Sequence, residues 1–251
     1  MTIKLLRLVF FYCFLIGVWK LVSLSEIFPP YLFPDPTLVW QSLLANLGSG
    51  LIVDALKNSL TRLAIGYFLA FIVGSIIGMA NAISKTLDDT IGSLIVGLQS
   101  LPSIAWLPFA ILWFGLNESA IIFVVFMGTV CAIAISVQAG VVTLPPLLKR
   151  AGLTFGANRW QMCRYVIIPG ILPSLVQGLK LGWSFAWRSL LAGELLFYTP
   201  GIGHLLNLGR DLNDVNLLAA TMIVIVVVGL AVDRLVFGRV DSAVRRRWGL
   251  A

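Results

Sequence analysis

Long uncharged apolar segments are the feature that most constrains how this chain of 251 residues can fold. Hydrophobic residues make up 59% of the chain and charged residues only 12%, whereas about a quarter of a soluble domain is charged. A helix needs about 20 mostly apolar residues to cross the hydrocarbon core of a bilayer. Several segments have that length, so the sequence excludes an ordinary globular enzyme and a disordered chain, and it predicts a membrane-spanning protein.

Six segments are predicted to cross the membrane as helices, because a helix satisfies its own backbone hydrogen bonds and an open strand does not. The third contains Pro102 and Pro108, which are expected to kink or break it. A short amphipathic helix is expected near 37–47. The basic start of the first segment also resembles a signal peptide, but no small-residue cleavage site follows, which favours an uncleaved helix. The six segments are 5–24, 60–83, 91–113, 119–141, 174–198 and 215–237.

Basic residues are distributed unevenly over the loops, and the net charge is +7. Lys and Arg accumulate on the cytoplasmic side of membrane proteins. With a cytoplasmic amino terminus, the inner segments hold most of the basic residues, including 245–247, while the outer segments hold Lys57 and Arg210, with Arg62 near a segment end. The pattern predicts a multi-pass protein of the bacterial cytoplasmic (inner) membrane, in contact with lipid and with both termini inside. Basic membrane loops explain the charge without nucleic acid.

The sequence contains no pattern typical of a catalytic or metal centre. Its three cysteines are not spaced in pairs, and it has one histidine. No phosphate-binding loop G-x-x-x-x-G-K-[ST] occurs, so any ATP must be hydrolysed by another chain. An intramembrane enzyme is less favoured, because neither His-Glu-x-x-His nor clustered aspartates are found. A self-sufficient secondary transporter or channel stays an alternative, although the internal repeats common in such proteins are not evident.

Two pairs of glycines have the spacing that lets helices approach closely. They are Gly74 with Gly78, in the second segment, and Gly178 with Gly182, in the fifth. Packing inside the bundle is the simpler interpretation, and an interface with another subunit is the alternative.

The loop between the fourth and fifth segments covers residues 142–173. Loops longer than about 15 residues without structure of their own are uncommon. Leu147, Ala151 and Phe155 recur at four-residue spacing and predict a short amphipathic helix. Gly156 follows at once and can end this helix, because glycine adopts positive φ without strain.

A second short helix is predicted after Gly156. Asn158 is placed to cap it, and Gln161 stands three residues later, as in a capping box. Its apolar residues are Trp160, Cys163 and Ile167, and Pro169 is expected to stop it. Two such helices form a compact knob, which either fits a groove of a partner protein or lies on the lipid surface. The residues alone do not decide between these two roles.

This loop resembles the EAA loop of binding-protein-dependent ABC importer permeases. The family pattern is Glu-Ala-Ala, three residues, Gly-Ala and a later proline. Gly156, Ala157 and Pro169 match it, and Ala151 matches the first alanine. Arg150 stands where the family has Glu, and Gly152 where it has the second Ala.

Four other segments are similar to nitrate, sulfonate and taurine permeases, in the same order along the chain. With the loop they extend from residue 34 to residue 203. They are Pro34-Asp35-Pro36; Pro102 to Pro108 with the following Trp113-Phe114-Gly115-Leu116-Asn117-Glu118; Ala192-Gly193-Glu194; and Gly201-Ile202-Gly203.

The resemblance implies an all-α membrane protein, a type I ABC importer permease with six transmembrane helices. Residues 1–251 would form a single transmembrane domain, with its core over about 56–240 and a cytoplasmic coupling loop over about 147–170. The chain would be non-catalytic and hold no metal or cofactor. A small anion such as nitrate or an aliphatic sulfonate such as taurine would be the solute.

The implied partners are a second permease copy or a close relative, an extracytoplasmic solute-binding protein, and two ABC ATP-binding subunits that hold ATP and Mg. The ATP-binding subunits would dock on the loop. The implied residues of this coupling loop are Arg150, Ala151, Gly152, Phe155, Gly156, Ala157 and Pro169.

The fifth segment carries polar residues that the apolar pattern does not require. Lys180, Ser184 and Arg188 lie at four-residue spacing on one helix face, and Glu194 follows. We expect Arg188, with Ser184 and Glu194, to line a translocation path, because a guanidinium forms a planar fork of donors for an oxyanion or a sulfonate. The alternative for Arg188 is a structural pair with Glu194 or with backbone carbonyls. Lys180 is expected to extend toward the inner interface.

Overall fold

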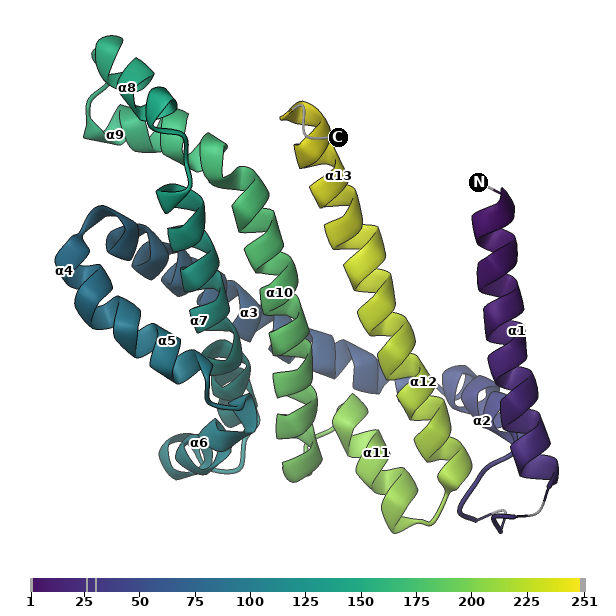
Figure 1. The fold of residues 1–251 in the computed structure, drawn as a ribbon. Helices are drawn as coiled ribbons and strands as arrows, with labels where there is room; N and C mark the ends of the chain where they lie inside the picture. The colour runs from purple at the N-terminus through teal and green to yellow at the C-terminus, as the bar shows by residue number, and fades with distance from the viewer. Residues whose placement is uncertain (1, 26, 30, 249–251) are drawn as a thin grey trace. The chain divides into compact units, whose positions relative to one another are not determined.

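The computed structural model describes residues 2–25, 27–29 and 31–248, and only the backbone of residues 2–5. Regular structure in these residues is helical, without a β-strand, as predicted (Figure 1). They include five helices long and apolar enough to cross a membrane, and a sixth if one bent pair of helices counts as a single span. The ends of the predicted domain, residue 1 and residues 249–251, lie outside the described residues.

The chain divides into two compact units, which are described separately. The first contains residues 1–59 and 198–227, and the second contains residues 60–197 and 228–251. Helices α3 and α12 begin in the first unit and continue into the second. The first unit is built from α1 (Thr2–Leu24), α2 (Pro36–Gly48), the start of α3 (Leu51–Ile83), α11 (Ile202–Asp211) and most of α12 (Val215–Ala231).

The short helix expected near 37–47 is α2, and its start is set by local chemistry. Asp35 caps it by accepting a hydrogen bond from the Thr37 N–H at 2.7 Å, and Pro36 occupies the first turn, where a missing N–H costs nothing. Asp35 also forms an ion pair with Lys20 of α1, and the Trp19 indole N–H donates to the Pro34 carbonyl at 3.0 Å. These contacts tie the end of α1 to the start of α2.

The second unit contains most of the membrane-spanning helices and the residues of the candidate site. After α3 come α4 (Lys85–Leu87), the π-helical turn η1 (Asp88–Gly92), α5 (Ser93–Gln99), the 3₁₀ turn η2 (Ser103–Trp106), α6 (Leu107–Phe114) and α7 (Glu118–Val142). Then follow α8 (Pro146–Thr154), α9 (Arg159–Gln161), the π-helical turn η3 (Met162–Ile167), α10 (Ile168–Leu196), the π-helical turn η4 (Val232–Phe237) and α13 (Gly238–Arg247).

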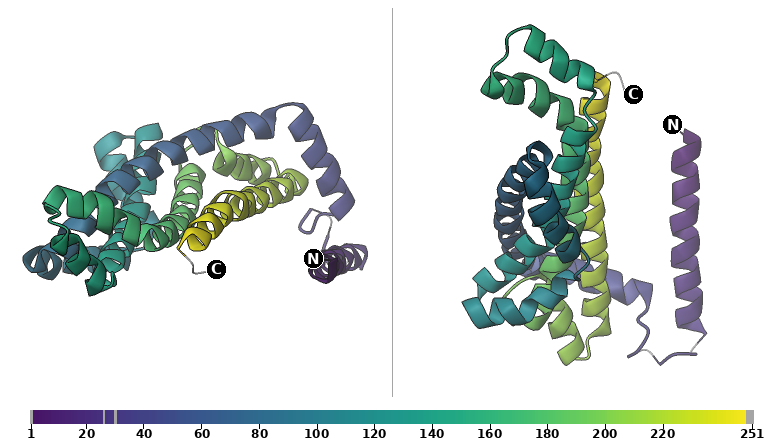
Figure 2. Two further views of the ribbon diagram at one scale, coloured as in Figure 1. Left: turned by 90° about the horizontal axis from the view of Figure 1, so that it is seen from above. Right: turned by 60° about the vertical axis from the view of Figure 1, so that its left-hand side comes forward.

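Helices α7 and α10 lie side by side at the centre of this unit (Figures 1 and 2). Val125, Ile133 and Val137 of α7 are buried, and so is Leu190 of α10. Both predicted glycine pairs face α7: an added Cβ on Gly74 would lie 2.7 Å from the Val130 carbonyl oxygen, and Gly178 packs on Ser136. Packing inside the bundle, the simpler interpretation of these glycines, is therefore confirmed.

The third predicted segment is broken, as its prolines indicated. The helical stretches Lys85–Gln99 and Ser103–Phe114 meet at 104°. The break falls at Ser100 to Pro102, while Pro108 lies in the first turn of α6, where the absent N–H has no helical partner to lose. Of the two prolines, Pro102 stands at the break and Pro108 is accommodated.

The prediction that Pro169 stops the second short helix was wrong. The chain stays helical from Arg159 to Leu196. Pro169 lies in the first turn of α10, directly after the π-helical turn η3. A wider π turn changes the pairing of the backbone at this junction, so the missing N–H of the proline is accommodated without ending the helix.

Candidate functional site

Helices α8 and α9, with η3, form a hairpin over residues 146–167, called here the α8–α9 hairpin. Gly156 has a φ of 73° and ends α8, as predicted. The Ala157 N–H donates to the Gly152 carbonyl at 3.0 Å and closes the turn. Gly152 is buried against Met162 and Val166 of the second limb, where a Cβ would lie 2.8 Å from Met162 Cε. The glycine that replaces the family's second alanine thus lets the two limbs pack closely.

The start of the second limb has the predicted capping box. The Asn158 N–H donates to Gln161 Oε1 at 2.9 Å, and the Gln161 N–H donates to Asn158 Oδ1 at 2.8 Å. This reciprocal pair satisfies two backbone donors at a helix start, so the direction of the second limb is set by residues close in sequence.

The tip and sides of the hairpin expose large apolar side chains, called here the hairpin apolar surface. Phe155 is 89% exposed, and the predicted stripe of Leu147, Ala151 and Phe155 faces outward. Several large apolar side chains exposed on one hairpin are typical of an interaction site. Arg150 is also exposed on α8. The surface comprises Leu147, Leu153, Phe155, Trp160 and Tyr165.

The hairpin lies at the same end of the second unit as the carboxyl end of α13 (Figures 1 and 2). Trp248, directly after α13, lines a cavity of about 660 Å³ with Ala151 and Gly152 of α8 and with Pro169 of α10. The hairpin, α10 and the residue that follows α13 therefore border one shared cavity.

A second cavity, of about 380 Å³, opens at the break between α5 and η2. Arg188 of α10 contributes its only cationic side chain, and Gln99, Ser100 and Ser103 contribute amide and hydroxyl groups. The full lining consists of residues 98–104, of Met127, Gly128 and Cys131 from α7, and of Phe185, Arg188 and Ala192 from α10.

Arg188 is exposed and held by its own helix. Its Nε donates to the Ser184 carbonyl at 3.0 Å, and its guanidinium carbon lies 5.3 Å from the centre of the Phe185 ring. In the part of the chain that the structure describes, Arg188 takes part in no ion pair. Ser184 lies on the predicted face, but it contributes its backbone carbonyl to Arg188 and does not line the cavity.

Glu194 pairs with Arg62 of α3, not with Arg188. Glu194 is fully buried, Arg62 is 3% exposed, and Arg62 Nη1 donates to Glu194 Oε1 at 2.9 Å. Arg62 Nη2 also donates to Oε1 of Glu118, the first residue of α7, at 2.7 Å. This cluster of Arg62, Glu118 and Glu194 joins three helices, and Glu194 does not line the cavity that Arg188 lines.

Lys180 forms an ion pair with Asp233 of η4, with 3.3 Å between Nζ and Oδ2. Both side chains are partly exposed, so the pair lies at the surface of the second unit.

A family model described as the binding-protein-dependent transport system inner membrane component matches residues 70–246 of the chain. The chain belongs to this family. The match runs from α3 to α13 and includes the hairpin, the broken segment and the Arg188 cavity.

Relatives within this family are similar along most of their length. The taurine transport system permease protein TauC of Escherichia coli (strain K12) is 30% identical over 224 residues, covering 87% of this chain and 82% of that protein. The nitrate import permease protein NrtB of Synechococcus elongatus is 30% identical over 194 residues, covering 75% and 69%. A chain of the MetNI methionine ABC transporter, solved in inward facing conformations, has a TM-score of 0.66 over 77% of this chain and 96% of that one.

That solved structure is 20% identical to this chain, so the likeness shows a shared fold. The family and the type I importer permease fold that the sequence predicts are confirmed, and the chain is a membrane permease component of ABC transport.

The apolar pattern placed Arg62 near the end of a membrane-spanning segment and did not indicate its role. A signal was present, because an ionisable residue within a membrane-spanning helix usually pairs inside the bundle. Its partners lie 56 and 132 residues away in sequence.

Proposed function

We propose that this permease is the membrane-spanning subunit of an ATP-driven importer for a small oxyanion or sulfonate. It works with a second copy or a close relative, with two ABC ATP-binding subunits, and with an extracytoplasmic solute-binding protein. ATP and Mg are bound in the partner subunits, because this chain lacks a phosphate-binding loop. Residues 1–251 act as one transmembrane domain, with its core over about 56–240.

The exposed hairpin apolar surface is the observation that supports docking of the ATP-binding subunits. Phe155 projects from a hairpin that is braced by Gly152 packing and by the Asn158–Gln161 capping box. A braced hairpin moves as one body, so a pull on its tip reaches α7 and α10 without being lost in local bending. The coupling-loop residues that we propose are Arg150, Ala151, Gly152, Phe155, Gly156, Ala157 and Pro169, of which the buried Gly152 holds the two limbs together.

The proposed orientation has both termini and the hairpin in the cytoplasm. The hairpin and the arginine cluster 245–247 lie at one end of the second unit (Figure 2). Concentration of basic residues on one side of the membrane is typical of the cytoplasmic face. An inner-membrane family is consistent with this direction of insertion.

The Arg188 cavity supports a small anion as the solute. Its guanidinium has no carboxylate partner among the described residues, and serine hydroxyls and the Gln99 amide stand around the same space. Such a set can replace the hydration of an oxyanion or a sulfonate by directed hydrogen bonds. Taurine and nitrate appear in the names of two similar permeases, which agrees with this class of solute. Ser184 positions the Arg188 side chain through its backbone carbonyl, and Glu194 supports the helices around the path through its buried ion pair with Arg62.

The experiment that tests the proposal replaces Gly156 by valine in the assembled transporter. A β-branched residue at a φ of 73° is strained by about 1–2 kcal/mol, so the turn between the limbs must change. We expect membrane insertion to persist while copurification of the ATP-binding subunits or solute-stimulated ATP hydrolysis falls at least ten-fold.

Gly97→Val is the matched control, because Gly97 has an ordinary helical φ and no neighbour within 4 Å of an added Cβ. We expect this control to retain coupled hydrolysis. Normal copurification and coupled uptake in Gly156→Val would refute docking at the hairpin.

A further inference from the structure

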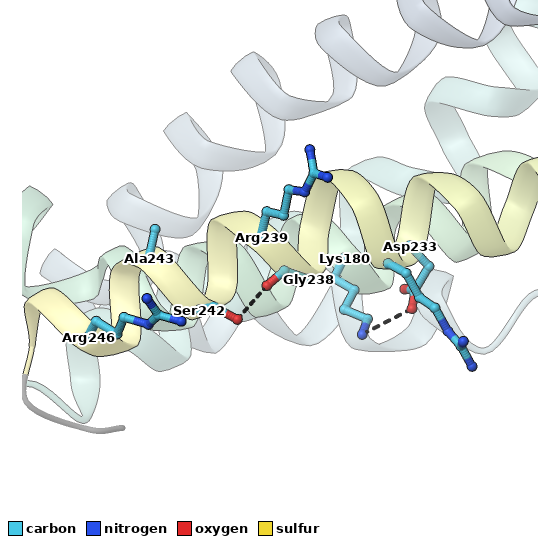
Figure 3. Close-up of a pocket in the computed structure, with 8 residues that line it drawn as sticks. Lys180, Asp233, Gly238, Arg239, Ser242, Ala243 and Arg246 are labelled. Carbon is cyan, nitrogen blue, oxygen red and sulfur yellow. Dashed lines mark hydrogen bonds and ion pairs between the residues drawn. The ribbon is translucent and has the colours of Figure 1, made fainter. Parts of the chain in front are cut away.

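A basic groove runs between α10 and the helix formed by η4 and α13, and it shares no lining residue with the cavity beside the hairpin or with the Arg188 cavity. Its volume is about 510 Å³, and its lining contains four basic side chains and one acidic one (Figure 3). The groove is lined by Lys180, Asp233, Arg234, Gly238, Arg239, Ser242, Ala243 and Arg246.

Helical spacing and small side chains create this hollow. Arg239, Ala243 and Arg246 are separated by four and three residues, which places them along one side of α13. Gly238, Ser242 and Ala243 leave room between the longer side chains. In Figure 3, Arg246 reaches along α13 toward Ser242, whose hydroxyl donates to the Gly238 carbonyl at 2.7 Å.

Most of the positive charge in the groove has no acidic partner. Lys180 is paired with Asp233. The neighbouring carboxylate, Asp241, is occupied by Arg245 at 2.9 Å and by the Gln177 amide at 2.9 Å. Among the described residues no ion pair includes Arg234, Arg239 or Arg246. The lining of the groove therefore includes three arginines that take part in no ion pair among the described residues.

Exposed apolar residues next to the groove indicate the source of an anion that pairs with these arginines. Leu181 on α10 and Leu235, Val236 and Val240 on the other helix are all exposed. Arginine pairs with phosphate through two parallel hydrogen bonds, and acyl chains cover apolar helix surface. An ion from solution would satisfy the arginines but leave these apolar neighbours uncovered.

We propose that this groove binds the phosphate group of an anionic phospholipid, whose acyl chains lie on the adjacent apolar surface. The location in the cytoplasmic leaflet rests on the orientation given under the proposed function. A lipid held here contacts α10 and α13 together and stabilises their packing at the end of the second unit that carries the hairpin.

The test uses the full chain purified with its partners, exchanged into a neutral detergent and examined by native mass spectrometry. Phosphatidylglycerol is added, with phosphatidylcholine as the zwitterionic comparison and inorganic phosphate as the soluble one. The variants are Arg239→Gln, Arg246→Gln and the control Arg247→Gln, whose arginine is the next residue on α13 but does not line the groove. Each groove variant is expected to retain about five-fold less bound phosphatidylglycerol than wild type, a typical effect of one basic residue at an anionic surface.

Retention of phosphatidylglycerol by wild type and by Arg247→Gln, with loss in both groove variants, supports the proposal. Equal loss in Arg246→Gln and Arg247→Gln would refute it, because only general charge would then matter. Displacement of the lipid by millimolar inorganic phosphate would refute a lipid source. Unchanged lipid retention combined with loss of the ATP-binding subunits in Arg246→Gln would assign the groove to a protein partner instead. Lipid retention does not require transport, so a failure here is distinguishable from a failure of the proposed function.

Discussion

The ion pair between Arg62 and Glu194 lets the packing of the second unit be tested by a graded series of substitutions. Arg62 is 3% exposed and Glu194 is fully buried, whereas Glu118, the other partner of Arg62, is 65% exposed. Removal of one member of a buried pair typically costs about 3–5 kcal/mol, because the remaining charge loses its compensation. Loss of an exposed pair costs about 0–1 kcal/mol.

These values predict the order in which three single variants lose folding stability. Arg62→Met removes both ion pairs of the cluster and is expected to destabilise by about 3–5 kcal/mol. In Glu194→Gln, Arg62 keeps its ion pair with Glu118 at 2.7 Å, so this variant is expected to be destabilised less than Arg62→Met. Glu118→Gln is expected to cost about 0–1 kcal/mol. The double variant Arg62→Met/Glu194→Leu removes both buried charges and should recover much of the loss.

The measurement is reversible unfolding of the purified chain in mixed micelles, followed by circular dichroism as the fraction of denaturing detergent is raised. Membrane insertion of each variant is checked first, so that unfolding is compared among inserted chains. If Arg62→Met were as mild as Glu118→Gln, or if the double variant were less stable than either buried single variant, the structural importance of the buried pair would be refuted.

Two further predictions concern charged groups elsewhere in the chain. Arg188→Gln should lower uptake of a small oxyanion or sulfonate at least ten-fold at normal expression, because Arg188 lines the cavity. The control is Arg7→Gln, which replaces an exposed arginine on α1 and should leave uptake unchanged. Equal uptake in both variants would show that Arg188 is not part of the translocation path. The hydrogen bond from Lys20, with those from Thr37, lowers the pKa of Asp35 from 3.8 to about 2. The stabilisation from Asp35 is therefore complete above pH 3.8 and is lost as the pH falls toward 2. In an acid titration, wild type should be more stable than Asp35→Asn above pH 3.8, and the two stabilities should become equal below pH 2.

Features that depend on nearby residues were predictable from the sequence. Segment length and apolarity indicated the spans, because a chain in lipid must close its hydrogen bonds within each helix. Gly156 and the Asn158–Gln161 box define the hairpin through contacts within a few residues, and the structure has both as expected. The break at Pro102 follows equally from local covalent geometry.

Pro169 is a residue whose structural effect could not be predicted from its immediate sequence neighbours. Whether a proline ends a helix or is absorbed depends on the turn before it, and here the π-helical turn η3 lets the helix continue. The four-residue spacing of Ser184 and Arg188 was correctly placed on one face, but the spacing does not say what that face meets.

Tertiary structure decided which charges pair and which line a cavity. Arg62 and Glu194 are 132 residues apart, and their contact depends on how α3 and α10 are rotated and aligned along their axes. Apolar composition does not specify rotation, because side chains that face lipid and side chains that face another helix are equally apolar. Packing of the helices therefore placed Glu194 with Arg62 and left Arg188 facing a cavity, a distinction that residue type and spacing do not contain.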